Sequence, residues 1–309
     1  MGIKPATPRK SPVHVSGRWM LLTLIFGAGV LYCLMATGGA RPRVVESFRL
    51  LAELTVFAAA AVMGYVAARQ FSPGQEARLS WMLISLTAAL FFLADVGIYL
   101  PSVVNAKPVA SAALLTAVAA ITLSRVFLVW GLWRMARVYR ASGLGFGLYD
   151  RDFGAMVLLA ALNLLTLIFG ANAVRFQLSN TGADLIHWIL IICLPLPLGL
   201  IVCSVLAVII WRYSQQMGGG LVAKAWQSVL LYTLLLPVRT IMVGLSTSLL
   251  DPGSRWAWVT GEISYLGLAL AVWALYLGAS YQYEACARSL TAEIDAYGSY
   301  VTATEPAEA

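Results

Sequence analysis

Long apolar segments, bounded by turn residues, constrain this chain more than any other feature. A helix needs about 20 apolar residues to cross the roughly 30 Å hydrocarbon core of a bilayer. We count eight segments of that length in the 309-residue chain. They lie near residues 18–37, 47–70, 79–100, 109–136, 153–174, 184–212, 223–249 and 257–282. Glycine and proline clusters, such as those at 72–74 and 251–253, separate neighbouring segments and indicate tight connections.

Composition excludes the alternatives to a membrane-embedded fold. Charged residues make up 11% of the chain and hydrophobic residues 60%, whereas about 25% of residues are charged in an ordinary soluble domain. A soluble domain of this size cannot bury so much apolar surface in one core. The sequence therefore predicts an all-α, polytopic transmembrane helical bundle of about eight spans. It excludes a soluble enzyme, a disordered protein and a nucleic-acid-binding protein, in spite of a net charge of +7.

The distribution of Lys and Arg predicts the orientation of the chain. Of the 21 such residues, 13 fall on the side of the N-terminus, six on the opposite side, and two inside the segments. Because cytoplasmic loops carry excess Lys and Arg, we expect both termini in the cytoplasm of a bacterial cell, with the bundle in its inner membrane. The expected organisation is a basic, disordered tail over 1–17, a bundle over 18–283 and a short acidic tail over 284–309. Alternatively, the first segment is a signal peptide whose cleavage leaves seven spans.

Five ionisable residues lie inside the apolar segments and carry the functional argument. Each is costly at bilayer depth, by at least about 2.5 kcal/mol for Asp or Arg near the centre, so each should face the bundle interior and pair. Glu53, Asp95 and Glu262 share one level, roughly 8–9 Å below the outer boundary at 1.5 Å per residue. Arg239 lies near the middle of the membrane and Arg125 deeper toward the cytoplasm. Arg125 and Arg239 are therefore candidates for buried ion pairs.

Polar and aromatic residues extend this group on the same helix faces. Tyr99 follows Asp95 on one helical stripe, Tyr265 follows Glu262 on another, and His187 lies about one turn into the sixth segment. We expect an outward-facing, water-accessible cavity that binds a ligand or an ion. The alternative is a set of structural ion pairs near the interface. The candidate binding residues are Glu53, Asp95, Tyr99, His187, Arg239, Glu262 and Tyr265.

Prolines at membrane depth are candidates for hinges. Pro195 and Pro197 lie in the sixth segment, and Pro237 lies two residues before Arg239 in the seventh. A proline inside a helix removes a backbone donor and clashes with the carbonyl four residues earlier, which kinks the helix. A static kink that only shapes the packing is the alternative.

Motifs for cofactors and metals are missing from the sequence. The four cysteines form no C-x-x-C pair, so no zinc motif is present, and no metal site is predicted. Two histidines are too few for bis-His haem ligation, and no lysine lies at mid-membrane to bind retinal covalently. The cofactor is left unknown. No catalytic constellation emerges, although an intramembrane enzyme using Glu53, Glu262 and His187 is a third functional alternative.

Short loops leave no room for an inserted catalytic domain, so we expect a sensor, a scaffold or a subunit of a membrane complex. By architecture alone, the chain is similar to the multi-helix membrane input regions of bacterial sensors. A proton-coupled secondary transporter is the alternative. Expected partners are membrane lipids, a protein partner or a second copy of the chain, and a small ligand or ion. Trp130, Trp133, Arg134, Arg137 and Arg140 mark the inner interface, where anionic lipid attracts cations.

Overall fold

The computed structural model describes most of the chain, with gaps between some of the helices. The described residues are 12–37, 42–105, 111–141, 157–169, 195–216, 220–248, 250 and 254–304. Within them the chain forms eight α-helices and no strands. Seven are long: α1 (Pro12–Thr37), α2 (Pro42–Arg69), α3 (Glu76–Asn105), α4 (Ser111–Ala141), α7 (Pro195–Gln216), α8 (Gly220–Ser248) and α9 (Arg255–Thr304). The eighth is a short apolar helix, Val157–Phe169.

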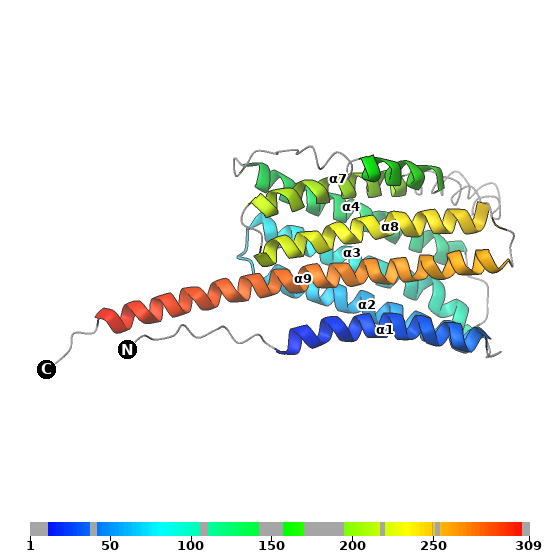
Figure 1. Ribbon diagram of the computed structural model, residues 1–309, viewed down its shortest axis with the longest axis horizontal. Helices are drawn as coiled ribbons and strands as arrows, with labels where there is room; N and C mark the ends of the chain where they lie inside the picture. Colours follow the sequence, from blue (N-terminus) through cyan, green and yellow to red (C-terminus); the bar gives the residue numbers. More distant parts are fainter. Residues whose placement is uncertain are drawn as a thin grey trace.

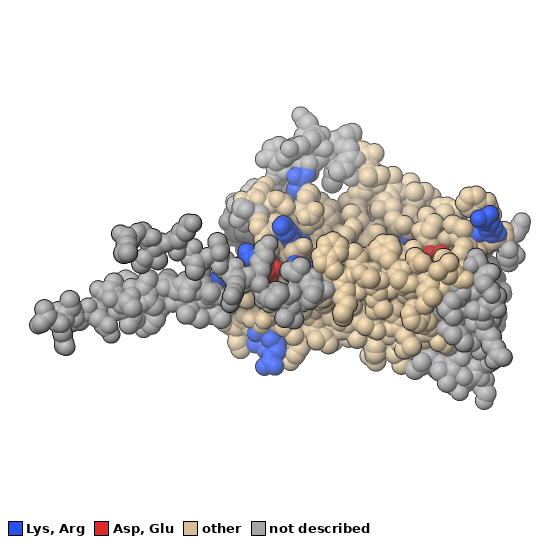
Figure 2. Space-filling view, turned by 60° about the horizontal axis from the view of Figure 1, so that its bottom comes forward, with Lys and Arg blue, Asp and Glu red and all other residues tan. Residues whose placement is uncertain are grey.

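All seven long helices are apolar enough to cross a membrane. They run side by side as one bundle (Figure 1). On the face drawn in Figure 2, charged side chains lie toward the two ends of the bundle, and a broad tan band without them lies between. Helix length and composition thus support the predicted all-helical, multi-pass membrane protein.

The direction of α7 shows where an eighth crossing belongs. Gly199 of α7 packs against Arg125 of α4, and the ring of Tyr213 stacks on that of Tyr139 with centroids 6.4 Å apart. Arg125 precedes Tyr139 in α4, and their partners Gly199 and Tyr213 follow in the same order in α7. The two helices therefore run in the same direction. The chain therefore crosses the bundle once more between these two helices.

The short helix lies on that return path. Leu159, near its start, shares a groove with Tyr213, whereas the carbonyl of Phe169, at its end, lies against Gly244 of α8. At 1.5 Å per residue the helix covers only about 20 Å, less than the predicted span 153–174. Residues 170–194 lie outside the described residues; they include the end of the predicted span 153–174 and the beginning of the span 184–212.

Two helices extend into the expected tails. Helix α1 begins at Pro12, inside the tail expected over 1–17. Helix α9 continues to Thr304, inside the tail expected over 284–309, and its last part projects beyond the bundle (Figure 1). The start of α1 and the projecting part of α9 lie at the same end of the bundle, as an even number of crossings requires.

The core is built from close helix contacts and large aromatic side chains. Trp81 of α3 packs against Trp226 of α8 with ring centroids 5.3 Å apart. The indole N–H of Trp226 donates a hydrogen bond of 2.9 Å to the hydroxyl of Tyr139, which ties α8 to α4. Gly64 of α2 allows a close approach to Ser85 of α3, because a Cβ at Gly64 would lie 3.0 Å from the Cβ of Ser85. These contacts lie within one molecule and hold α2, α3, α4 and α8 in register.

Candidate functional site

Five of the predicted site residues gather at one level of the bundle. They lie near the end of the bundle where α2 begins and α3 ends. Together with Arg49, which the sequence analysis did not select, they form what we call the charged cluster. Its members come from α2, α3, α8 and α9. They are Arg49, Glu53, Asp95, Arg239, Glu262 and Tyr265.

Arg49 holds the outer part of the charged cluster together. Its Nη1 donates a hydrogen bond of 2.9 Å to Oε1 of Glu262, which joins α2 to α9 as an ion pair. Its guanidinium carbon lies 3.8 Å from the ring centroid of Tyr265 and 5.0 Å from that of Tyr32. The Tyr265 hydroxyl donates to the backbone carbonyl of Arg49 at 3.3 Å. Arg49 thus carries an ion pair, two aromatic contacts and a backbone anchor at the junction of three helices.

The inner part of the charged cluster is more deeply buried. Glu53 of α2 lies in Coulombic range of Asp95 from α3 and of the guanidinium groups of Arg49 and Arg239. Asp95 is 6% exposed, and its Oδ2 has no hydrogen-bond partner. Gly267 of α9 lies beside Arg239, leaving room for that side chain between α8 and α9. Glu53 and Asp95 thus face each other with Arg239 as a shared counter-charge.

The charges in this cluster do not balance when every group is ionised. Glu53, Asp95 and Glu262 supply three carboxyl groups, and Arg49 and Arg239 supply two guanidinium groups. Arg49 is already engaged with Glu262, so Arg239 faces the remaining two carboxyl groups. An uncompensated charge is strongly unfavourable in a low-dielectric interior. Among the described residues, the excess carboxyl group of the cluster therefore has no counter-charge of its own.

Arg125 lies apart from the charged cluster and has a different environment. Its Nη1 donates a hydrogen bond of 3.1 Å to the hydroxyl of Tyr232, and its guanidinium carbon lies 4.9 Å from the ring centroid of Phe91. Arg125 is 5% exposed, and its Nε has no hydrogen-bond partner.

The ion pairs expected for the two buried arginines are not seen. Among the described residues neither Arg125 nor Arg239 has a carboxylate within 4.0 Å. A hydroxyl and an aromatic face take the place of the carboxylate at Arg125, which a weakly hydrated guanidinium accepts well.

Other candidates fall at helix ends or outside the described residues. Tyr99 lies in α3 one turn after Asp95, whereas His187 lies outside the described residues. Pro195 and Pro197 lie in the first turn of α7 as it is described, and the residues before Pro195 lie outside the described residues. Of the three hinge candidates, Pro237 lies in the middle of its helix, α8. The hinges and the water-accessible cavity stay predictions.

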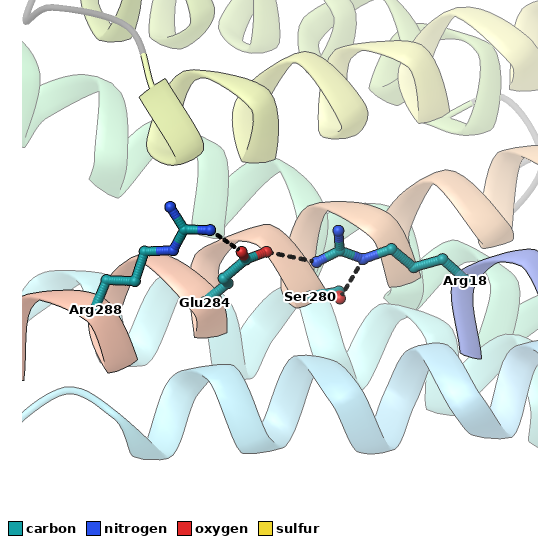
Figure 3. Close-up of polar contacts among 4 residues, drawn as sticks. All are labelled: Arg18, Ser280, Glu284 and Arg288. Atoms are coloured by element: carbon teal, nitrogen blue, oxygen red, sulfur yellow. Dashed lines mark hydrogen bonds and ion pairs between the residues drawn. The ribbon is translucent and has the colours of Figure 1, made fainter. Parts of the chain in front are cut away.

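At the opposite end of the bundle, charged contacts fasten α1 to α9 (Figure 3). Arg18 of α1 donates to Oγ of Ser280 at 2.8 Å and to Oε2 of Glu284 at 3.1 Å. Glu284 also accepts a hydrogen bond from Arg288. The indole N–H of Trp273 donates to the backbone carbonyl of Arg18 at 3.0 Å. We call this group the terminal clasp. Nothing in the sequence near Arg18 indicates these partners, which lie more than 250 residues away along the chain.

Arg49 could have been found by helical spacing. It precedes Glu53 by four residues, so both side chains lie on one face of α2. Its position near the end of the segment made it resemble an interfacial cation instead.

Comparison of the chain with protein-family models, with curated proteins and with solved structures found no match. The functional argument therefore depends on the geometry of the chain itself.

Proposed function

We propose that this chain is a proton-responsive sensor or complex subunit of a bacterial inner membrane, with both termini in the cytoplasm. The observation that carries the proposal is the excess carboxyl group of the charged cluster, buried where α2, α3, α8 and α9 meet. The described residues contain no group of three metal-ligating side chains, which favours a proton as the neutralising species. The free Oδ2 of Asp95 marks a position for that proton.

Loss or gain of the proton acts on α8 through Arg239. When both Glu53 and Asp95 are charged, they attract the guanidinium of Arg239 more strongly than when one is neutral. Arg239 follows Pro237 by two residues, and Pro237 lacks the N–H that would bond to the carbonyl of Thr233. A change in the pull on Arg239 therefore bends α8 at its weakest point. Helix α9, which packs along α8, carries the displacement to the opposite end of the bundle.

Infrared difference spectroscopy on the full chain in lipid nanodiscs tests the proposal. Stepping the pH should produce a carbonyl band of a protonated carboxylic acid that disappears in Asp95→Asn or in Glu53→Gln. Glu76→Gln is the matched control, because Glu76 is an exposed carboxylate at the other end of the bundle, paired with Arg134. The proposal is wrong if no such band appears, or if it persists in both cluster variants.

Proton-coupled transport is the second candidate, and one observation favours it. The buried hydroxyl of Tyr232 bonds to Arg125 and lies in Coulombic range of Arg239. Polar groups therefore continue from the charged cluster toward the opposite half of the bundle. Proton flux into liposomes holding the purified chain, lost in Asp95→Asn and reduced in Tyr232→Phe, would assign transport. An infrared signal without flux would assign sensing.

A further inference from the structure

A groove at the end of the bundle opposite the charged cluster has the chemistry of a lipid site. It lies between α4, α7 and the short helix Val157–Phe169 and has a volume of about 530 Å³. This volume falls in the range of small-molecule sites, about 300–1,000 Å³. Val205, Leu206 and Ile209 form its apolar wall along α7, and Leu159 closes it from the short helix.

The mouth of the groove is basic and aromatic. Arg137 and Arg140 lie one turn apart at the end of α4, so their guanidinium groups reach the same side. The guanidinium carbon of Arg137 lies 4.9 Å from the ring centroid of Trp133, which fixes its position. Arg134, one turn earlier, is paired with Glu76. The residues that line the groove include no carboxylate, and among the described residues neither Arg137 nor Arg140 forms an ion pair, although Arg137 lies in Coulombic range of Glu76. Both guanidinium groups can therefore bind an anion from outside the chain.

The apolar part and the basic part follow the order expected of a phospholipid. Along α7 the groove runs from Val205, inside the candidate span Leu198–Gln216, to Tyr213 near its end. That is about 12 Å of helix. An acyl chain needs apolar walls at membrane depth, and a phosphate needs cations at the interface. Basic pockets between transmembrane helices are known to hold anionic headgroups.

We propose that this groove binds one anionic phospholipid, with its phosphate on Arg137 and Arg140 and an acyl chain along Val205 to Ile209. The site is independent of the charged cluster, which lies at the other end of the bundle. Occupation ties α4, α7 and the short helix together at this groove.

Native mass spectrometry of the full chain tests the proposal with defined lipids. The chain is released from mixed micelles containing phosphatidylglycerol or phosphatidylcholine, and retained lipids are counted. We expect one phosphatidylglycerol to be retained selectively. Arg137→Gln with Arg140→Gln should weaken its retention about thirty-fold, equivalent to about 2 kcal/mol at 1.4 kcal/mol per factor of ten. Val205→Trp, which fills the apolar part, should weaken retention of the same lipid.

A matched control removes two other cations from the same end of the bundle. Arg69→Gln with Arg78→Gln changes the net charge equally but touches no residue of the groove. Equal loss of lipid in this control, or equal retention of phosphatidylcholine, would overturn the proposal. If the chain forms a dimer that Val205→Trp dissociates, and no lipid is retained selectively, the groove is an interface between two copies of the chain. That result would also overturn the proposal. Unchanged far-ultraviolet circular dichroism and an unchanged melting temperature check that each variant is folded.

Discussion

The ion pair between Arg49 and Glu262 should contribute measurable stability, because it is partly buried and well aligned. The N–O distance is 2.9 Å, and the side chains are 23% and 15% exposed. A hydrogen bond to a charged group contributes about 1.5–3 kcal/mol net, so about 2 kcal/mol is expected here. Glu262→Gln should lower the free energy of unfolding by about that amount, since it leaves the Arg49 charge half-buried without its partner.

A double-mutant cycle of Glu262→Gln, Arg49→Met and the double variant separates the ion pair from the aromatic contact. Arg49→Met also removes the stacking on Tyr265, for which about 1 kcal/mol is typical, so its total loss should be about 3 kcal/mol. The double variant should be no less stable than Arg49→Met alone. The coupling free energy is then about 2 kcal/mol.

Reversible unfolding in mixed micelles, followed by tryptophan fluorescence, measures these free energies. The exposed pair Arg134–Glu76 is the matched control, and the same cycle there should give a much smaller coupling. Independent sites add within about 0.3–0.5 kcal/mol. If the losses at Arg49 and Glu262 add within that margin, the ion pair does not stabilise the bundle and the reasoning fails.

Two further predictions concern helix packing. Gly64→Leu should separate α2 from α3 and lower the melting temperature, because even a Cβ at Gly64 would lie 3.0 Å from Ser85; an unchanged melting temperature would show that the two helices are not in contact there. Tyr139→Phe should cost about 1 kcal/mol of unfolding free energy by leaving the buried N–H of Trp226 without an acceptor. If Tyr139→Phe costs as much in a Trp226→Phe background as in the unmodified chain, the loss does not come from this hydrogen bond.

The positions of the helices follow from the apolar segments because the bilayer imposes a minimum length on each span. Seven of the predicted segments overlap the long helices. The segment 153–174 is described only over the helix Val157–Phe169, because its other residues lie outside the described part of the chain.

Side-chain partners depend on which helices become neighbours and on how each helix is rotated about its axis. The depth of a residue along its predicted span gives neither. The sequence places Glu53 and Asp95 at the same depth, and in the structure they lie in Coulombic range of each other. Arg125 was expected to bind a carboxylate, yet it bonds to Tyr232, which is 107 residues away. Nothing local to Arg125 indicates that partner. By contrast, Arg49 lies one turn before Glu53, and that spacing was present in the sequence.

Helix α9 connects the two charged groups of the bundle without a break. It supplies Glu262 to the charged cluster and Glu284 to the terminal clasp, about 33 Å apart at 1.5 Å per residue. Because a continuous helix moves nearly as a rigid body, a shift of Glu262 is felt at Glu284. The terminal clasp resists that shift by holding α9 to α1 through Arg18. Helix α9 therefore joins the charged cluster to the terminal clasp, which holds it to α1.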